Sequence, residues 1–480
     1  MRKIKFIGLT MVLMGATLVS CNPSNGGITK IYLGMWPDAA LTREVAMFQE
    51  WKAAFENDHP EYEIIPSTYE YDPITAVTKA QAGELPTIFQ TWFTEPEMLK
   101  SGGYIRDITA QITELDWLRH MDEDMKSILT FDDKIYGVPR DGYGLGMVLN
   151  LQMLDYHGLL VNPETGLREV DASGKLKIKG DDGTPFYPTT FEEVYRWAEI
   201  INEQSGHEEK GLLVLSANEE GGWQFSNMAW NFGANLQVQG SDGKWHANLT
   251  DPKAVEALEW IRRLSEDHLV LGNDAGNESS VVYSDWYSKL AGERVGMAFI
   301  GNDVVQLAVT SGKMNLDDIA LVPMPAGPYG DRHALFGGTP FVFAHNASDA
   351  EVTGALMFLE YMGRSPLVSE VSLKALEDGA KVSQAKNIPI IPSWLPWINS
   401  EYTAAVAAIN AKYSNIHQPY YEDYFALMPE MRRKEDKYST QYMYTLLDNC
   451  ISQILAKPNS NALALLTDAN GKLETRLNGK

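Results

Sequence analysis

The sequence lacks the short motifs that identify common hydrolases and nucleotide-binding proteins. It holds no HExxH zinc pattern, no GxSxG nucleophile elbow and no P-loop. Gly142, Gly144 and Gly146 imitate a phosphate-binding loop, but Met147 stands where a dinucleotide motif needs its third glycine. Nine scattered histidines without ligand-like spacing argue against a bound metal. The sequence therefore indicates neither an NTPase nor a metal-dependent hydrolase, and it implies no cofactor.

Positive charge is also scarce. The chain carries 40 Lys and Arg against 64 Asp and Glu, which gives a formal net charge of -24 at pH 7. A surface of this sign repels the phosphates of nucleic acid, so we expect no nucleic acid partner. It also repels anionic small molecules at long range, although a local basic pocket can override that effect.

Long apolar runs are absent except near the N-terminus. The mean hydropathy is -0.24 and 44% of the residues are hydrophobic, which is typical of water-soluble lobes. Arg2, Lys3 and Lys5 precede an uncharged apolar stretch from Phe6 to Val19. This stretch is shorter than the about 20 apolar residues of a membrane-spanning helix. We therefore predict that residues 1–20 are an export signal peptide.

The two cysteines of the chain stand at positions 21 and 450. Leu18-Val19-Ser20-Cys21 resembles the lipobox of bacterial lipoproteins, which implies that Cys21 is lipidated and becomes the first mature residue. Residues 21–27 would then tether a folded body to the extracytoplasmic face of the cell membrane, and plain secretion is the alternative. Since an acylated Cys21 forms no disulfide, we expect Cys450 to be a small core side chain.

Strands and helices alternate along the first part of the mature chain. The patterns predict strands at 28–36, 62–65 and 87–90, and helices from 42 and near 74–82. This order predicts a mostly parallel, open α/β sheet, in which ligands lie beyond the carboxyl ends of the strands. Trp36 and Trp92 fall at or just past two such ends.

Other local signals concern structure alone. Residues 142–146 are predicted to form a flexible glycine loop, and the polar segment 161–189 a surface excursion with a small hairpin. Thr190 and Glu193 form a capping box for a helix over 191–202, and Asp251-Pro252 opens another helix. Strands are predicted at 294–300 and 319–322, and the chain beyond Ser365 reads as mostly helical.

Five blocks stand in a specific order across nearly the whole mature chain. They are GELPTIF at 83–89, GGYIRDIT at 102–109, IYGVP at 135–139 with Asn150, RVGMAFIG at 294–301, and Gly337-Gly338. Together they resemble family 1 extracellular solute-binding proteins of bacterial ABC importers, the group that includes maltose-binding protein. The resemblance implies a two-lobed, type II periplasmic-binding-protein-like α/β fold, with an α/β sheet flanked by helices in each lobe and a hinge between them.

The resemblance also implies a division of the chain. Lobe one is expected to comprise 28–142 and 301–363, and lobe two 143–300 and 364–480, with chain crossings near 142–150, 299–303 and 363–372. The lobes would close over a small-molecule ligand and deliver it to the permease subunits of an ABC transporter. The transporter's ATPase must be another chain, and a monomer is expected.

Aromatic side chains are the first candidates for ligand contact in this cleft. Sugar rings present apolar C–H faces and many hydroxyls, which indole and phenol rings, carboxylates and amides hold well. By its position after the 87–90 strand, Trp92 resembles a cleft-facing aromatic residue of the maltose-binding member. Trp223 lies where the family opens a helix against the cleft. For Trp36, the sequence favours ligand contact and core packing equally.

Four polar candidates complete the predicted site. Tyr143 stands on the expected crossing, and Asp303 stands just beyond the 294–300 strand. Glu95 and Asp38 are weaker candidates for hydrogen bonds to sugar hydroxyls.

Two alternatives to a carbohydrate receptor remain at this point. An extracellular glycoside hydrolase also needs an aromatic cleft and two carboxylates. Because the chain has 64 acidic residues, the presence of such a pair does not distinguish a hydrolase from a receptor. The same fold can instead bind a polyol, a glycosyl phosphodiester, a peptide or a metal complex. No catalytic residue is predicted.

Overall fold

The computed structural model describes residues 27–271 and 280–479. The predicted signal peptide 1–20, Cys21 and the tether up to residue 26 lie outside the described residues. No helix in the described part of the chain is long and apolar enough to cross a membrane. Cys450 is buried, as predicted.

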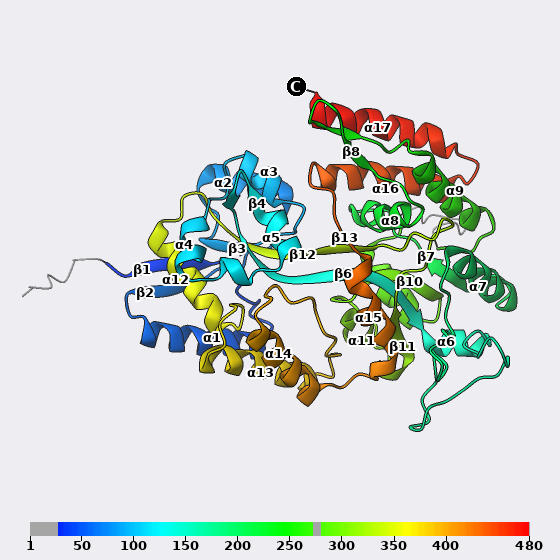
Figure 1. Ribbon diagram of the computed structural model, residues 1–480, viewed down its shortest axis with the longest axis horizontal. Helices are drawn as coiled ribbons and strands as arrows, with labels where there is room; N and C mark the ends of the chain where they lie inside the picture. Colours follow the sequence, from blue (N-terminus) through cyan, green and yellow to red (C-terminus); the bar gives the residue numbers. More distant parts are fainter. Residues whose placement is uncertain (1–26, 272–279, 480) are drawn as a thin grey trace, which may run out of the picture.

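A mixed sheet joins the two halves of the molecule (Figure 1). Its order is β2 (Tyr62–Pro66), β1 (Thr29–Leu33), β3 (Ile88–Gln90), β12 (Ala334–Phe343), β6 (Val138–Asn150), β10 (Val295–Gly301) and β7 (Lys210–Leu213). Two more strands pair beside this path: β11 (Ile319–Val322) with β6, and β13 (Arg432–Lys434) with β12. Two small ribbons are separate: β4 (Thr130–Phe131) with β5 (Lys134–Ile135), and β8 (Gln237–Gln239) with β9 (Trp245–Ala247).

The prediction of a mostly parallel sheet is wrong at its centre. β1 runs parallel to β2 and β3, and β10 runs parallel to β7. However, β12 is antiparallel to β3 and β6, and β6 is antiparallel to β10 and β11. β6 carries the chain from one lobe to the other and β12 carries it back, so these adjacent crossings run in opposite directions.

The helices form two lobes on either side of this crossing (Figure 1). In the described residues one large hydrophobic core lies in lobe two and two smaller ones lie in lobe one. Lobe one holds α1 (Thr42–Asp58), α2 (Pro73–Ala82), α3 (Pro96–Ser101), α4 (Thr109–Glu114), α12 (Asp349–Tyr361), α13 (Glu370–Ala385) and α14 (Ser400–Tyr413). Lobe two holds α6 (Leu151–Tyr156), α7 (Phe191–Gln204), α8 (Glu220–Asn231), α9 (Pro252–Glu266), α10 (Tyr283–Ala291), α11 (Gln306–Thr310), α15 (Glu422–Met431), α16 (Thr440–Ala456) and α17 (Ala462–Asn478). α5 (Glu123–Leu129) packs on β6.

The packing differs from the expected division of the chain at two segments. Residues 305–336 join the core of lobe two, because β11 pairs with the second half of β6. Conversely, α13 and α14 pack on the core of lobe one through Ala375, Tyr402 and Val406. The third crossing therefore follows α14, whereas the sequence placed it at 363–372.

The glycine-rich segment 142–146 is part of strand β6 and not a flexible loop. A Cβ atom on Gly142 would lie 2.5 Å from Met125, and one on Gly146 would lie 2.7 Å from the Val322 carbonyl oxygen. Neighbours therefore press on this strand closely enough to exclude side chains at these positions. Glycine is present for close packing and not for freedom of the backbone.

Most other local predictions are confirmed. The Thr190–Glu193 capping box is formed at the start of α7, and the Asp251 side chain caps α9. The strands at 294–300 and 319–322 appear as β10 and β11. Within 161–189, two isolated bridges, Val170 to Leu176 and Lys179 to Pro185, form the turns of the predicted excursion.

Candidate functional site

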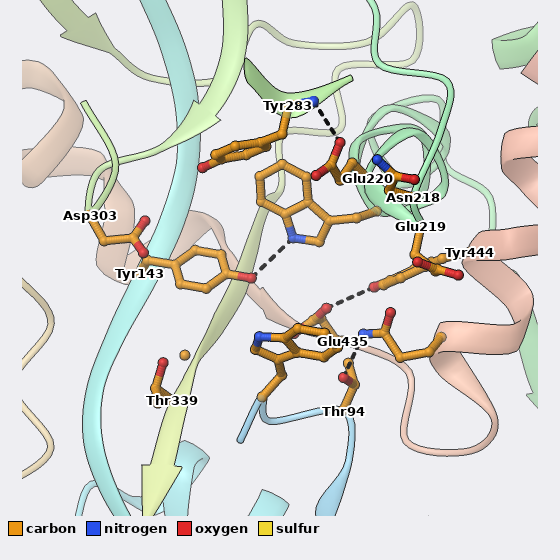
Figure 2. Close-up of a pocket in the computed structure, with 14 residues that line it drawn as sticks. Thr94, Tyr143, Asn218, Glu219, Glu220, Tyr283, Asp303, Thr339, Glu435 and Tyr444 are labelled. Atoms are coloured by element: carbon orange, nitrogen blue, oxygen red, sulfur yellow. Dashed lines mark hydrogen bonds between the residues drawn. The ribbon is translucent and has the colours of Figure 1, made fainter. Parts of the chain in front are cut away.

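A cavity of about 330 Å³ lies between the lobes, beside the crossing strands (Figure 2). Lobe one contributes the segment after β3, with Trp92 and Thr94, and the crossing strand β12 contributes Gly338 and Thr339. The remaining lining residues come from β6 and from lobe two: Tyr143, Asn218, Glu219, Glu220, Trp223, Tyr283, Asp303, Glu435, Gln441 and Tyr444.

Two aromatic residues from different elements meet at this wall. The indole Nε1 of Trp223, on α8, donates a hydrogen bond to the Tyr143 hydroxyl on β6 at 3.1 Å. Their ring centroids lie 6.1 Å apart in an edge-to-face arrangement. A Cβ atom on Gly337 of β12 would overlap the Tyr143 hydroxyl. Glycine at this position thus makes room for the phenol that orients the indole.

The N-terminus of α8 is held in an unusual conformation. Asn218 and Glu219 have φ angles of 59° and 67°, which is the left-handed region that residues with side chains seldom adopt. The Asp448 carboxylate on α16 accepts hydrogen bonds from the backbone N–H groups of Glu219 at 2.6 Å and Gly222 at 2.7 Å. The α16 helix therefore fixes where α8 begins, and with it the position of Trp223 one turn later.

Four carboxylates line the cavity, and three of them accept a hydrogen bond at its edge. The Tyr444 hydroxyl donates to Glu435 at 2.8 Å and the Tyr283 backbone N–H donates to Glu220 at 2.7 Å (Figure 2). The Thr445 hydroxyl donates to Glu219 at 2.9 Å. These bonds use one oxygen of each carboxylate and leave acceptor capacity for a ligand.

The protein around the cavity perturbs the protonation of its acids. Burial raises the pKa of Glu435 to about 8 and the pKa of Glu220 to about 7. The Asp303 side chain is exposed to the cavity, but the surrounding protein displaces most of the bulk water near its carboxylate. This desolvation, together with the nearby charge of Asp141, raises the pKa of Asp303 to about 7. Of the described residues that line the cavity, none is Lys, Arg or His.

Trp92 forms the wall of lobe one. Its side chain is 44% exposed, and its ring meets Tyr71 edge-on at 5.4 Å between centroids. The Tyr71 hydroxyl in turn donates a hydrogen bond to Glu95, which is buried. Across the opening, the Gln441 amide donates to the Thr94 hydroxyl at 2.7 Å and so connects the two lobes.

Comparison with known proteins identifies the class of this two-lobed molecule. The family model of bacterial extracellular solute-binding proteins matches residues 50–371. The chain belongs to this family. A search of curated protein sequences finds no match.

Solved structures of solute-binding proteins share the fold at low sequence identity. An ABC transporter solute-binding protein from Thermotoga lettingae, bound to α-D-tagatose, has a TM-score of 0.66 and 13% identity, with 94% of this chain and 100% of that chain covered. Maltose-bound MalE3 of T. maritima has a TM-score of 0.64 and 15% identity, covering 93% and 98%. UgpB of Mycobacterium tuberculosis, in complex with glycerophosphocholine, has a TM-score of 0.65 and 14% identity. The match covers 94% of this chain and 98% of that chain. These similarities confirm the two-lobed fold.

The structure of this solute-binding protein brings four of the predicted site residues together. Trp92, Tyr143, Trp223 and Asp303 all line the same cavity. Glu95 is not among the lining residues, because its carboxylate faces Tyr71 behind Trp92. A contact of any of them with ligand stays a prediction.

Trp36 and Asp38 lie away from this cavity. The Trp36 ring packs edge-on against Phe48 of α1 at 5.4 Å and joins the edge of the core of lobe one. Asp38 is exposed and accepts a hydrogen bond from the Ala40 backbone N–H at 2.8 Å. The sequence placed Trp36 and Asp38 at the cleft because they follow the carboxyl end of β1. After this end, however, the chain turns toward α1.

Sequence reasoning missed several members of the cavity wall. Glu219 and Glu220 stand four and three residues before Trp223, so the sequence already indicated that they lie near it. Tyr283, Glu435 and Tyr444 carry no such signal, because they reach the cavity from remote segments of the chain. Within residues 27–271 and 280–479, no three metal-ligating side chains lie close enough together to hold a metal ion.

Proposed function

We propose that this solute-binding protein captures a carbohydrate between its lobes and delivers it to the permease of an ABC transporter. The observation that supports the proposal is the pairing, across one cavity, of the exposed Trp92 indole with the hydrogen-bonded Trp223–Tyr143 pair. Aromatic faces suit the C–H surfaces of a sugar ring, and the carboxylates beside them suit its hydroxyls.

The proposal includes attachment to the membrane through lipidated Cys21, with the folded lobes on the extracytoplasmic side. It assigns no catalytic residue, and the ligand leaves the protein unchanged. Delivery would follow closure of the lobes about the crossing strands, which is a hinge motion of few residues.

A thermal-shift screen of the purified protein tests the proposed ligand class. The panel contains mono- and oligosaccharides, polyols, sugar phosphates and peptides. A ligand that binds only the folded state stabilises it by about 2.7 kcal/mol at roughly a hundred times its dissociation constant. We expect a saccharide to raise the melting temperature and to be recovered intact. If only peptides or phosphates shift the transition, the carbohydrate proposal fails.

Recovery of a cleaved saccharide would instead favour a glycoside hydrolase. The anchor is tested separately by Cys21→Ala, which we expect to move the protein from the membrane fraction to the soluble fraction. Retention of the variant on the membrane would contradict lipidation at this residue.

A further inference from the structure

We infer that the cavity selects a saccharide that carries a basic nitrogen, such as an amino sugar, over neutral and acidic saccharides. This inference rests on the proposed carbohydrate function and narrows it to one chemical class. It follows from the combination of charge and aromatic surface in the cavity, and from the absence of any cation in its described lining.

The charges of the lining are all of one sign. Glu219, Glu220, Asp303 and Glu435 face the cavity, and its described lining contains no basic side chain. Buried Glu95, behind Trp92, adds to this negative field. The acids come from three separate parts of the chain, which the fold has brought to one place.

Arg140 and Arg433 are paired with groups outside the lining, although the Arg140 charge also partly offsets the rise that burial causes in the pKa of Asp303. Arg140 pairs with Asp141 at 2.7 Å and donates to the Gln90 side chain at 2.8 Å. Arg433 stacks on the Trp230 ring at 4.4 Å and donates to Asn235 at 2.8 Å. Neither guanidinium is among the residues that line the cavity.

Closure of the lobes makes this excess of negative charge costly. When water leaves the cavity, the carboxylates repel one another more strongly, because the effective dielectric constant falls. A neutral sugar supplies hydroxyl donors but no charge, so closure over it keeps the acids in the protonated form that burial already favours. A uronic acid adds repulsion. A protonated amine compensates the carboxylates directly through charge-assisted hydrogen bonds.

The aromatic residues favour the same ligand. The rings of Tyr143 and Tyr283 stand beside the carboxylates (Figure 2). Trp223 of lobe two and Trp92 of lobe one line the same cavity. The face of an aromatic ring attracts a cation as well as the C–H face of a sugar. An amino sugar therefore presents both features that this cavity recognises, whereas a neutral sugar presents one.

The test compares ligands that differ only in charge. For glucose, galactose and mannose, and for their β-linked di- and trisaccharides, calorimetry measures the affinity of the neutral sugar, its 2-amino and 2-acetamido derivatives, and its uronic acid. We expect an amino compound to bind at least roughly tenfold tighter than its neutral and acetylated counterparts. The preference should weaken between about 0.02 and 0.5 M salt, because ions screen charge.

Two variants assign the preference to the carboxylates. Asp303→Asn and Glu220→Gln should lower the affinity for the amino sugar by roughly fivefold or more relative to the affinity for the neutral sugar. Glu164→Gln, in an exposed turn of the 161–189 excursion, is the matched control that should change neither. Circular dichroism of each variant shows whether it is folded.

The outcomes separate this inference from the proposed function. If neutral saccharides bind as tightly as every amino derivative, the inference is overturned and the carbohydrate function stands. If no saccharide of the series binds, neutral or amino, the carbohydrate function itself fails. If Asp303→Asn loses equal affinity for the neutral and the amino sugar, that carboxylate binds hydroxyls. This result would also overturn the charge argument.

Discussion

Lobe one and lobe two line the same cavity in different ways. Lobe one presents the half-exposed Trp92, held only by an edge-on contact with Tyr71. The lining residues of lobe two are fixed by hydrogen bonds. Tyr444 donates one to Glu435, and Trp223 donates one to Tyr143 of the crossing strand β6. If the proposed function is correct, we expect lobe two to act as a preformed binding surface and lobe one as its cover.

Loss of the preformed wall should have the largest effect. Trp223→Ala removes an indole together with its hydrogen bond to Tyr143, and we expect it to cost about 2 kcal/mol in affinity, roughly thirtyfold. Calorimetry with the saccharide found by the screen measures this loss. Trp197→Ala is the control, since Trp197 is also a partly buried indole of lobe two but does not line the cavity. An equal loss in both variants would show a general effect on folding.

A second variant tests how tightly the wall of lobe two is built. A Cβ atom on Gly222 would overlap the Tyr444 backbone where α8 packs on α16, so Gly222→Ala should lower the free energy of unfolding by about 2 kcal/mol. In lobe one, Gly379 lies inside helix α13 with no atom near its Cβ position. Gly379→Ala should raise the stability by roughly 1 kcal/mol. Urea denaturation measures both, and effects of the same sign would contradict the packing argument.

Removal of the cover should have a smaller effect than removal of the wall. Trp92→Ala deletes a side chain that is 44% exposed and whose indole makes no hydrogen bond in the described structure. We therefore expect a loss of about 1 kcal/mol in binding free energy, roughly fivefold in affinity. The melting temperature of the free protein should barely change. Tyr156→Ala, at an 84% exposed site on lobe two, is the control. A loss larger than that of Trp223→Ala would reverse the roles assigned to the lobes.

The smallest expected effect is a dependence of stability on pH that originates in lobe two. The pKa values of Glu435, Glu220 and Asp303 are raised to about 8, 7 and 7, so the folded state keeps protons that the unfolded state releases. Their contribution is present in full below the unfolded pKa and is lost as the pH rises through the folded values. The melting temperature of the free protein should therefore fall between pH 6.5 and 8.

His246 contributes in the same window, because hydrogen bonds with Glu474 and Asp242 raise its pKa above 6.5 and its contribution is also lost as the pH rises. A variant is therefore needed to assign the slope to the acids. Burial lowers the pKa of His333 and His417, so they reduce stability only as the pH falls below their ordinary value of about 6.5. In lobe one, hydrogen bonds from Lys412 and Tyr413 lower the pKa of Glu377 to about 2, and that contribution is lost only in acid. Glu435→Gln should flatten the slope between pH 6.5 and 8, and an unchanged slope would contradict the assignment.

Local elements were predictable where their cause is local. The hydroxyl of Thr190 and the carboxylate of Glu193 cap α7 through atoms three residues apart, and alternating apolar residues form β1. Residues 142–146 show the opposite case. Glycine favours a loop in isolation, but contacts with Met125 and Val322, far away in sequence, decide that these residues belong to a strand.

The candidate site divides in the same way. Trp92 and Asp303 follow strands whose ends are visible in the sequence, so their positions near the cleft were predictable. Trp36 follows a strand as well, yet the turn after β1 directs it to Phe48. Tyr444 reaches the cavity because α16 packs against α8, and Glu435 because it follows β13, which pairs with β12. None of these elements carries that pairing in its own sequence.

The sequence by itself indicated the two-lobed fold through its resemblance to solute-binding proteins. Most helices and strands, and the many acidic and aromatic residues, follow from periodicity, caps and composition, which act within a few residues. Tertiary structure alone decided that β6 and β12 are antiparallel crossings, that α13 and α14 belong to lobe one, and that four carboxylates face one cavity without a cation in its described lining. These outcomes depend on contacts between residues hundreds of positions apart, and no local pattern encodes which distant partner a surface will meet.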